Sequence, residues 1–212
     1  MAAPARPGAP TRSHWLAAVV ASLLVAMSAQ AEPQTFVLDP ASTHAHFELM
    51  HFGTSTIRGR FSAIEGSITL DRAARSGRAD MSVATAAVST GFVPFDGIIR
   101  GPYLLDTTQY PTAYFVAQQF TFDGERLASV SGEFTLRGVG RTLVLKALRF
   151  SCRTEPKPKP DSKPDPEPGR ETCGGDFEGE FRRSAFGITH SLPFVADRVR
   201  LQVQVEASRP LP

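Results

Sequence analysis

The sequence lacks the motifs that usually mark an enzyme. It contains no Gly-x-Ser-x-Gly nucleophile elbow, no phosphate-binding loop of the Walker type and no His-Glu-x-x-His metal motif. Gly138-Val139-Gly140 is not followed by the third glycine of a dinucleotide-binding loop. We therefore expect a protein that is not an enzyme and needs no cofactor, with a hydrolase that carries no recognisable motif as the remaining alternative.

An excess of either charge is also missing. Without Arg6 and Arg12, which lie in the N-terminal segment, 21 basic residues balance the 21 acidic residues. A neutral chain without a basic stripe is a poor partner for nucleic acid or for an anionic lipid surface. We therefore expect no nucleic-acid partner.

Long apolar runs are missing except near the N-terminus. Residues 15–27 are almost all apolar, follow two arginines and precede Ala29-Gln30-Ala31, the small-x-small pattern that signal peptidase reads. This run is short for a transmembrane helix, and no later segment is apolar enough to be one. We predict that residues 1–31 are a signal peptide cleaved near Ala31 and that the mature chain, residues 32–212, is secreted to the periplasm. An uncleaved N-terminal anchor is the alternative.

Cysteine is scarce, with only Cys152 and Cys173. An even pair in an exported chain favours a disulfide bond, which would close a loop of about 20 residues. The alternative, a metal site, lacks a nearby histidine or further cysteine to complete a tetrahedral set.

Most of the remaining chain has the pattern of short β-strands. The segments are rich in Val, Phe, Thr and Ile and are separated by Gly, Asp and Pro. Asp123-Gly124 and the segment 137–141 predict tight hairpin turns. Many short strands at near-regular spacing predict an all-β sandwich or barrel. The candidate strands are Thr35–Leu38, Ala45–Phe52, Thr56–Phe61, Glu65–Leu70, Asp80–Ala87, Ala113–Phe122, Ala128–Leu136, Thr142–Phe150, Asp176–Phe181 and Val199–Glu206.

Two stretches break this pattern. Residues 93–105 do not alternate and predict a short helix or turn, in the kind of long connection where a barrel places a lid. Residues 153–172 have proline at every second to fourth position and alternate Lys with Asp or Glu, which predicts an extended, solvated surface loop. A docking segment for a proline-recognising partner is the alternative.

Histidines provide two candidate sites on one predicted strand. His44 and His46, with Glu48, share one side of the strand and are a candidate metal site, although all three also suit an ordinary solvent face. His51 shares the other side with Phe47 and Leu49 and should point inward. It is either a hydrogen-bonded core histidine or the polar contact for a ligand head group inside a pocket.

Aromatic residues are mainly phenylalanine, with 15 Phe against three Tyr and one Trp. Phe47, Phe61, Phe115, Phe134 and Phe181 fall inside candidate strands, where filling the core is their usual role. The interior of an eight-stranded barrel is also wide enough to hold one small ligand. An exported barrel with apolar walls and no catalytic group suggests a carrier of an apolar compound.

Several spaced motifs resemble those of the YceI-like family of exported polyisoprenoid-binding proteins. The resemblance covers residues 34–207, and Cys152 and Cys173 match a subgroup with a cysteine on each side of the last long loop. The matching positions are Asp39-Pro40, Phe47, His51-Phe52-Gly53, Ser55, Gly59, Phe61, Gly66, Ile68 and Asp71, followed by YPTAYF (110–115), SGEFTLRGVGRTLVL (131–145) and FRRSAFGI (181–188).

This resemblance implies an eight-stranded antiparallel, lipocalin-like barrel with a short helical lid segment and an apolar cavity for an isoprenoid or similar long-chain amphiphile. The sequence departs from the family pattern at the lid. Ser42 stands where the subgroup has a histidine, and Phe92 and Ile98 stand where it has lid histidines, while Arg100 is kept. An apolar entrance is therefore expected in place of a polar one.

The leading hypothesis is a periplasmic carrier of a polyisoprenoid-type lipid, with quinone-type or acyl lipids as related ligands. His51 and Arg100 are the candidates for contacting a polar head group. The alternatives are an interaction or stress-related envelope protein acting through the proline-rich loop, and a metal-binding protein using His44 and His46. An exposed edge strand would also permit a homodimer. The expected ligand-binding residues are Phe47, Leu49, His51, Ile57, Phe61, Ile68, Phe92, Phe95, Ile98, Ile99, Arg100, Tyr103, Phe115 and Phe134.

Overall fold

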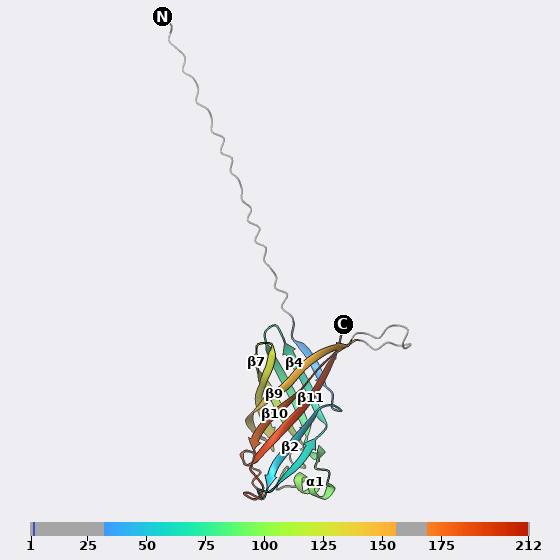
Figure 1. The fold of residues 1–212 in the computed structure, drawn as a ribbon, viewed down its shortest axis with the longest axis vertical. Coiled ribbons are helices and arrows are strands. Elements are labelled where there is room, and N and C mark those ends of the chain that lie inside the picture. Colours follow the sequence, from blue (N-terminus) through green and yellow to red (C-terminus); the bar gives the residue numbers. More distant parts are fainter. Residues whose placement is uncertain (1, 3–31, 156–168, 212) are drawn as a thin grey trace, which may run out of the picture. The chain divides into compact units, whose positions relative to one another are not determined.

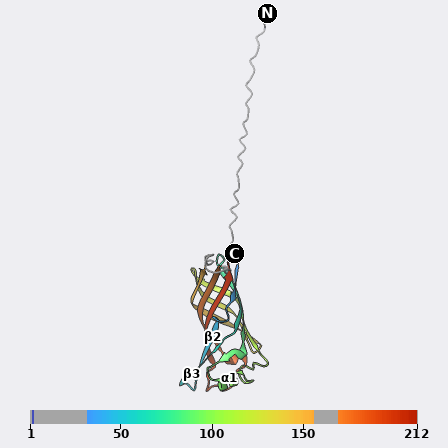
Figure 2. The same cartoon turned by 90° about the vertical axis from the view of Figure 1, so that its right-hand side faces the viewer.

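The computed structural model describes residues 2, 32–155 and 169–211. The predicted signal peptide, apart from residue 2, and residues 156–168 of the proline-rich loop lie outside the described residues. Figures 1 and 2 show the described part as a barrel of long, tilted strands with a short helix at one end. No helix among the described residues is long and apolar enough to cross a membrane.

Strands account for most of the described chain. The helix α1 spans Val93–Arg100, with Pro94 in its first turn, where a missing N–H costs nothing. Two 3₁₀ turns cover Thr85–Ala87 and Arg183–Phe186. The strands are β1 (Gln34–Leu38), β2 (His44–His51), β3 (Ser55–Phe61), β4 (Ile64–Asp71), β5 (Ser76–Ala84), β6 (Val88–Ser89), β7 (Thr112–Asp123), β8 (Arg126–Leu136), β9 (Val139–Glu155), β10 (Arg170–Arg182) and β11 (Arg198–Pro210).

These segments form eight antiparallel strands that close into a ring. β1 and β2 both pair with β11, at Val37 opposite Ser208 and Ala45 opposite Val203, so together they make one long interrupted strand. β3 with β4, and β5 with β6, are interrupted in the same way. Each long strand pairs with its neighbours in the sequence, and the pairing of β1 and β2 with β11 closes the sheet. The predicted eight-stranded barrel with a short helix is confirmed.

The inward faces follow the two-residue period of the sequence. In β7, Ala113, Phe115 and Ala117 are buried while Tyr114 is exposed. In β9, Leu143 and Leu145 are buried. Because successive side chains of a strand point to opposite faces, this alternation places one apolar row per strand inside the barrel.

Glycine is required at one bend of the interrupted strand β3–β4. Gly66 in β4 has a φ of +142°, and a Cβ atom there would lie 2.0 Å from the carbonyl oxygen of Asp80 on β5. Ala63, between β3 and β4, has a φ of +58°. These two positions let the β3–β4 strand bend around the barrel, and the first of them leaves no space for a side chain.

The interior is filled differently at its two ends. One buried cluster, which includes Phe36, Ile68 and Ala117, packs across the end where β1 meets the last part of β11. A second cluster, which includes Val88, Ile99 and Phe186, packs beneath α1 at the other end. Figure 1 shows α1 and the end of β11 at opposite ends of the barrel.

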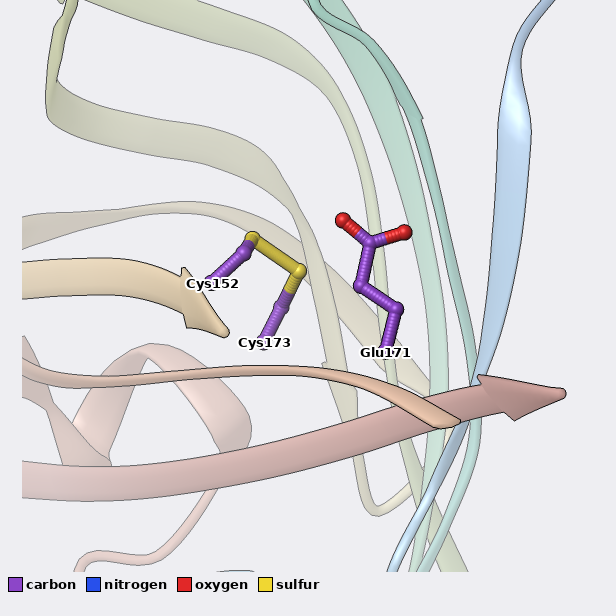
Figure 3. A group of neighbouring side chains, drawn as sticks. All are labelled: Cys152, Glu171 and Cys173. Carbon is purple, nitrogen blue, oxygen red and sulfur yellow. A yellow bond between two sulfur atoms is a disulfide. The ribbon is translucent and has the colours of Figure 1, made fainter. Parts of the chain in front are cut away.

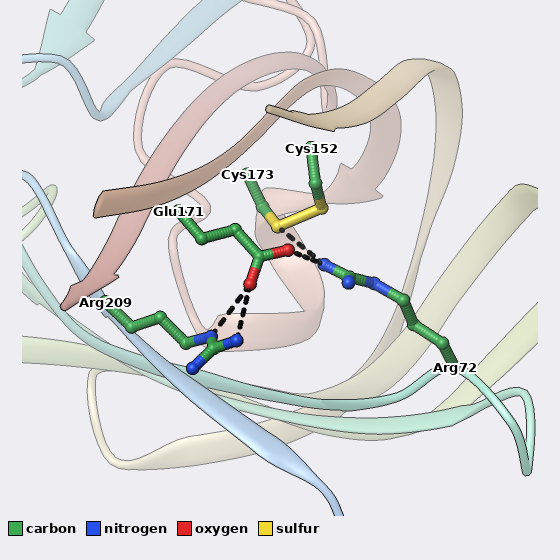
Figure 4. Close-up of a disulfide and its surroundings, with 5 residues drawn as sticks. All are labelled: Arg72, Cys152, Glu171, Cys173 and Arg209. Atoms are coloured by element: carbon green, nitrogen blue, oxygen red, sulfur yellow. Dashed lines mark hydrogen bonds and ion pairs between the residues drawn. A yellow bond between two sulfur atoms is a disulfide. The ribbon is translucent and has the colours of Figure 1, made fainter. Parts of the chain in front are cut away.

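The closed end also carries the predicted disulfide and a buried carboxylate. Cys152 of β9 and Cys173 of β10 are bonded and lie directly opposite each other. Glu171 is two residues before Cys173, accepts a hydrogen bond of 2.5 Å from Arg72 and one of 2.8 Å from Arg209, and is almost fully buried (Figure 4). The feet of the proline-rich loop, 153–155 and 170–172, are strand, which corrects the prediction that the whole of 153–172 is loop.

Glu171 and the two cysteines are close enough to resemble a metal site, since their ligand atoms lie within 4.8 Å of one another (Figure 3). Both sulfur atoms are committed to the disulfide, and both carboxylate oxygens bond to arginines. Only thiolates, not disulfide sulfurs, are good metal ligands. This group therefore seals the end of the barrel and does not offer a cation site.

Replacing both cysteines with serine should lower the free energy of unfolding. The bond closes a loop between residues 21 apart in the sequence. Loop-closure entropy assigns such a bond about 3 kcal/mol, or a fall in Tm of about 6–12 °C for a domain of this size. Thermal unfolding with and without reductant measures this loss. Reductant should not affect the double variant, and an equal Tm for the oxidised and reduced wild type would contradict the prediction.

Glu171→Gln should destabilise the protein in a pH-dependent way. Burial alone would raise the pKa of Glu171, but hydrogen bonds from Arg72 and Arg209 outweigh burial and hold the pKa below its ordinary value of 4.5. The carboxylate therefore stabilises the fold above pH 4.5, and this contribution is lost as the pH falls through the folded-state pKa. We expect a loss of about 2–3 kcal/mol near neutral pH. Urea unfolding at several pH values should show the difference between variant and wild type shrinking in acid.

Candidate ligand-binding cavity

An apolar cavity of about 340 Å³ occupies the half of the barrel nearer α1. Its polar lining residues are His51, Thr85, Arg183, His190 and Ser191. The volume falls in the lower part of the range typical of small-molecule sites. The apolar lining residues are Ala45, Phe47, Leu49, Ile57, Phe61, Ile64, Met81, Val83, Phe95, Ile98, Ile99, Leu104, Leu105, Ala113, Phe115, Phe134, Leu136, Leu143, Leu145, Phe181, Ile188, Val195, Val199, Leu201 and Val203.

The alternation in β2 and β3 supplies one wall of this cavity. Phe47, Leu49 and His51 point inward from β2, as the sequence predicted. Phe47 pairs with Gly59 of β3, where an added Cβ would lie only 2.4 Å from the Phe47 ring. The Phe47 ring therefore lies over the glycine and packs 5.6 Å from the ring of Phe61. Any side chain at Gly59 would displace the Phe47 ring.

The cavity opens to solvent beside α1. Ile98 lines the cavity and yet is 60% exposed, so it lies at the opening. We call this opening the mouth, formed by Ile98, His51, His190 and Val195. His190 stacks on Tyr103 at 5.3 Å between ring centroids, and Phe194 packs on Phe52 at 5.5 Å. These two aromatic pairs join the segment 189–195 to the residues after α1 and to the β2–β3 turn.

Arg183 holds the segment 189–197 against the barrel. Its side chain is 4% exposed and donates hydrogen bonds to four backbone carbonyls. The acceptors are Ile188 at 3.1 Å, His190 at 2.8 Å, Val195 at 2.8 Å and Ala196 at 2.9 Å. Burial lowers the pKa of Arg183, and the nearby charge of Asp197 opposes that shift. The guanidinium thus builds one wall of the mouth, and four of its five N–H donors are used within the protein.

Two other polar side chains fix α1. The carboxylate of Asp96 is buried and accepts hydrogen bonds from the backbone N–H and the hydroxyl of Thr90, which lower its pKa. Arg100, at the end of the helix, donates to the carbonyl of Ala86 at 2.8 Å and to that of Val88 at 2.7 Å. Arg100 therefore positions the helix, and its side chain does not line the cavity.

The structure brings most of the sequence-predicted ligand-binding residues to the cavity. The ten that line it are Phe47, Leu49, His51, Ile57, Phe61, Phe95, Ile98, Ile99, Phe115 and Phe134. Arg100 bonds to backbone carbonyls, and Ile68 lines a separate, smaller void. Phe92, just before α1, is 64% exposed, and Tyr103 is 72% exposed outside the cavity.

Sequence reasoning missed the contribution of residues 183–195. Arg183, Ile188, His190, Ser191 and Val195 all line the cavity but lie outside the regular strands. The one available signal was FRRSAFGI, in which Arg183 follows the inward Phe181 by two residues. That spacing places Arg183 on the inner face. An unpaired charge is costly there, so an arginine at this position indicates that hydrogen-bond acceptors lie nearby.

The candidate metal residues do not converge. The carboxylate of Glu48 lies 3.3 Å from Arg58 and 3.7 Å from Arg200, so its charge is already paired. His46 is exposed, whereas Nδ1 of His44 is buried without a hydrogen-bond partner. Among the described residues, these side chains do not form a cluster of three ligand atoms.

The model of the YceI-like domain matches residues 36–207, which is most of the chain. The chain belongs to the YceI-like family. A UPF0312 protein of Pseudomonas savastanoi pv. phaseolicola is 32% identical over 135 residues, which cover 62% of this chain and 70% of that protein. Protein YceI of Shigella flexneri is 27% identical over 174 residues, covering 81% of this chain and 85% of that protein.

Solved structures show the same fold at lower identity. BcnA of Burkholderia cenocepacia superposes with a TM-score of 0.64 at 20% identity, over 80% of this chain and 99% of that one. A polyisoprenoid-binding domain from Saccharophagus degradans gives a TM-score of 0.58 at 17% identity, over 82% of this chain and 98% of that one. The YceI-like barrel is therefore shared by proteins whose sequences differ widely.

Arg183→Leu should destabilise this YceI-like protein and open the mouth. The change leaves four backbone carbonyl groups without their donor, of which the bond to Ile188 is fully buried. One buried polar group left without its partner already costs about 1–3 kcal/mol. Chemical unfolding measures the loss, and amide hydrogen exchange should report faster exchange in residues 188–197. Arg183→Lys keeps the charge but has at most three donors. Its free energy of unfolding and its exchange rate in residues 188–197 should lie between those of the wild type and Arg183→Leu. Unchanged exchange in Arg183→Leu would contradict this role.

Proposed function

We propose that this protein is a periplasmic binding protein that carries an amphiphilic lipid of the isoprenoid type in its cavity. The observation that supports this most directly is an apolar chamber that opens at one end and has only five polar side chains in its lining. Quinone-type and acyl lipids have the same combination of an apolar chain and a polar end. The disulfide fits export to an oxidising compartment.

Burial of the lipid chain supplies the binding energy. Each methylene removed from water contributes about 0.8 kcal/mol, so a dozen buried methylenes contribute about 10 kcal/mol before costs. The loss of translational and rotational freedom on association costs about 4–15 kcal/mol. Affinity therefore depends on how much of the chain enters the chamber, and few polar contacts are needed.

The polar end of the lipid is placed at the mouth. His51, His190 and Ser191 are the polar lining residues there whose side chains make no hydrogen bond within the described residues, whereas four of the five N–H donors of Arg183 are used. Deeper in the barrel the lining residues, such as Phe115, Leu145 and Val203, are apolar. A lipid would therefore enter chain first and leave its head group near the two histidines.

The likeness to other proteins supports the same class of ligand. The Saccharophagus degradans neighbour is described as a polyisoprenoid-binding domain, and its barrel superposes on this one. The loop alternative has no comparable support, because residues 156–168 lie outside the described residues.

A substitution at the mouth tests this proposal. Ile98→Glu should lower the affinity for a fluorescent long-chain lipid probe about tenfold, because it removes roughly the burial energy of one aliphatic side chain from the entrance. Val93→Glu is the matched control, since Val93 lies on the same helix, is 77% exposed and does not line the cavity. We expect wild-type binding for this control.

Native mass spectrometry of protein secreted by a Gram-negative host gives an independent measurement. We expect an apolar lipid to co-purify with the wild type and to be depleted in Ile98→Glu. Protein that carries no lipid and takes up no probe would refute the carrier function.

A further inference from the structure

Large apolar side chains are exposed mainly at the end of the barrel that carries the mouth. Among the described residues, seven large apolar side chains are 60% exposed or more, and six of them lie at this end, where Figure 2 shows α1 and β3. The seventh, Val37, lies on β1 near the closed end. We call the six residues at the mouth the rim: Phe52, Phe92, Val93, Ile98, Tyr103 and Phe194.

The rim is continuous with the lining of the cavity. Ile98 belongs to both. The ring of Phe52 packs edge-on against the ring of His51 at 4.5 Å between centroids, and Tyr103 stacks on His190 at 5.3 Å. An apolar molecule that leaves the cavity therefore meets apolar and aromatic side chains at the mouth.

The chain around the mouth carries almost no charge. Segments 50–56, 89–99, 101–105 and 187–196 contain one charged residue, Asp96, when histidine is counted as neutral. The side chain of Asp96 is only 4% exposed, so its charge is not presented on the surface. Such a surface offers no charge to a nucleic acid or to an anionic head group. Attachment to the rim must therefore come from burial of apolar area.

The two ends of the barrel differ in this respect. The arginines next to the segments around the mouth, Arg100 and Arg137, donate hydrogen bonds to backbone carbonyl groups of the protein itself. At the closed end, the β4–β5 turn exposes Arg75 and the β7–β8 turn exposes Glu125. The barrel therefore has one apolar end, at the mouth, and one charged end, which would orient it at a boundary between water and an apolar phase.

We propose that the rim docks on the surface of a lipid bilayer with the mouth facing the membrane, so that a lipid passes between bilayer and cavity without crossing water. Apolar side chains of the rim insert at the boundary between head groups and acyl chains, where aromatic rings are favoured. A bilayer fits the rim better than a partner protein does, because it holds the ligand and accepts side chains from separate segments without a matching shape. This inference rests on the proposed lipid-binding function and names the place where the ligand is exchanged.

Two exposed valines at opposite ends of the barrel test this orientation. Residues 32–212 contain no tryptophan, so one introduced indole supplies all the tryptophan emission of that chain. We would compare Val93→Trp in the rim with Val37→Trp at the closed end, since these valines are 77% and 63% exposed. With phosphatidylcholine vesicles we expect a blue shift, and quenching by brominated acyl chains, for Val93→Trp alone. Equal spectral changes in the two variants would contradict a mouth that faces the membrane.

The same two positions test the strength of docking. Val93→Glu should weaken binding to phosphatidylcholine vesicles about tenfold, because it replaces an inserted apolar side chain with a charge. Val37→Glu is the matched control and should bind vesicles as the wild type does. Vesicle flotation with residues 32–212 measures both. Wild-type binding should not weaken when salt rises from about 0.05 M to about 0.5 M, because apolar contacts are not screened.

Binding of the fluorescent lipid probe in vesicle-free buffer separates docking from the carrier function. Probe binding without vesicle binding, or equal vesicle binding by Val93→Glu and Val37→Glu, overturns the docking surface and leaves the carrier function standing. Vesicle binding at the rim without probe binding refutes the carrier function instead.

Two further outcomes would assign the rim or the attachment to other causes. Vesicle binding that requires anionic lipid and is lost at high salt would be driven by charge and would overturn docking through the rim. A wild type that is dimeric in solution, becomes monomeric in Val93→Glu and ignores vesicles would show that the rim pairs with a second copy of the chain. Sedimentation of the wild type and both glutamate variants measures the oligomeric state, and we expect the same state in all three.

Discussion

The pairing of the interrupted strand β1–β2 with β11 is the interaction on which the rest of the structure depends. It converts a meander of antiparallel strands into a closed barrel, so that the terminal strands have partners on both sides. A closed sheet has one inner face, and the two-residue period of each strand places an apolar row on it. Closure by eight strands leaves an interior that side chains can nearly fill, and whether it is solid or hollow is decided by their sizes and positions.

Different side chains determine whether the interior is solid or hollow at the two ends of the barrel. Near the disulfide, Phe36, Phe177 and Leu127 meet in one cluster, and the ion-paired Glu171 lies in a sealed wall. Near α1 the strands β3 and β6 share only two residue pairs. The helix and the segment after it, together with residues 183–197, take the place of strand there, and these irregular pieces surround a space without filling it.

The regular part of this architecture could be predicted, and the irregular part could not. Alternation predicted the inward positions of Phe47, Leu49 and His51, because it depends only on neighbours in the sequence. The roles of Arg100 and Arg183 depend on carbonyl groups of residues 86–88 and 188–196, whose positions follow from how the loops fold. Arg100 was therefore expected to contact a ligand, although its side chain donates to backbone carbonyl groups.

Those backbone contacts also constrain how a ligand can enter. Both ends of α1 are fastened, by Asp96 to Thr90 and by Arg100 to the carbonyls of Ala86 and Val88. The opposite wall of the mouth is fastened by the four hydrogen bonds of Arg183. Swinging either wall outward would break several buried polar contacts at once, each costly in an apolar setting. Rotation of exposed side chains such as Ile98 breaks none of them. The backbone around the mouth is thus held in place while its exposed side chains can rotate. Ligand exchange through the mouth therefore requires no hinge in the backbone.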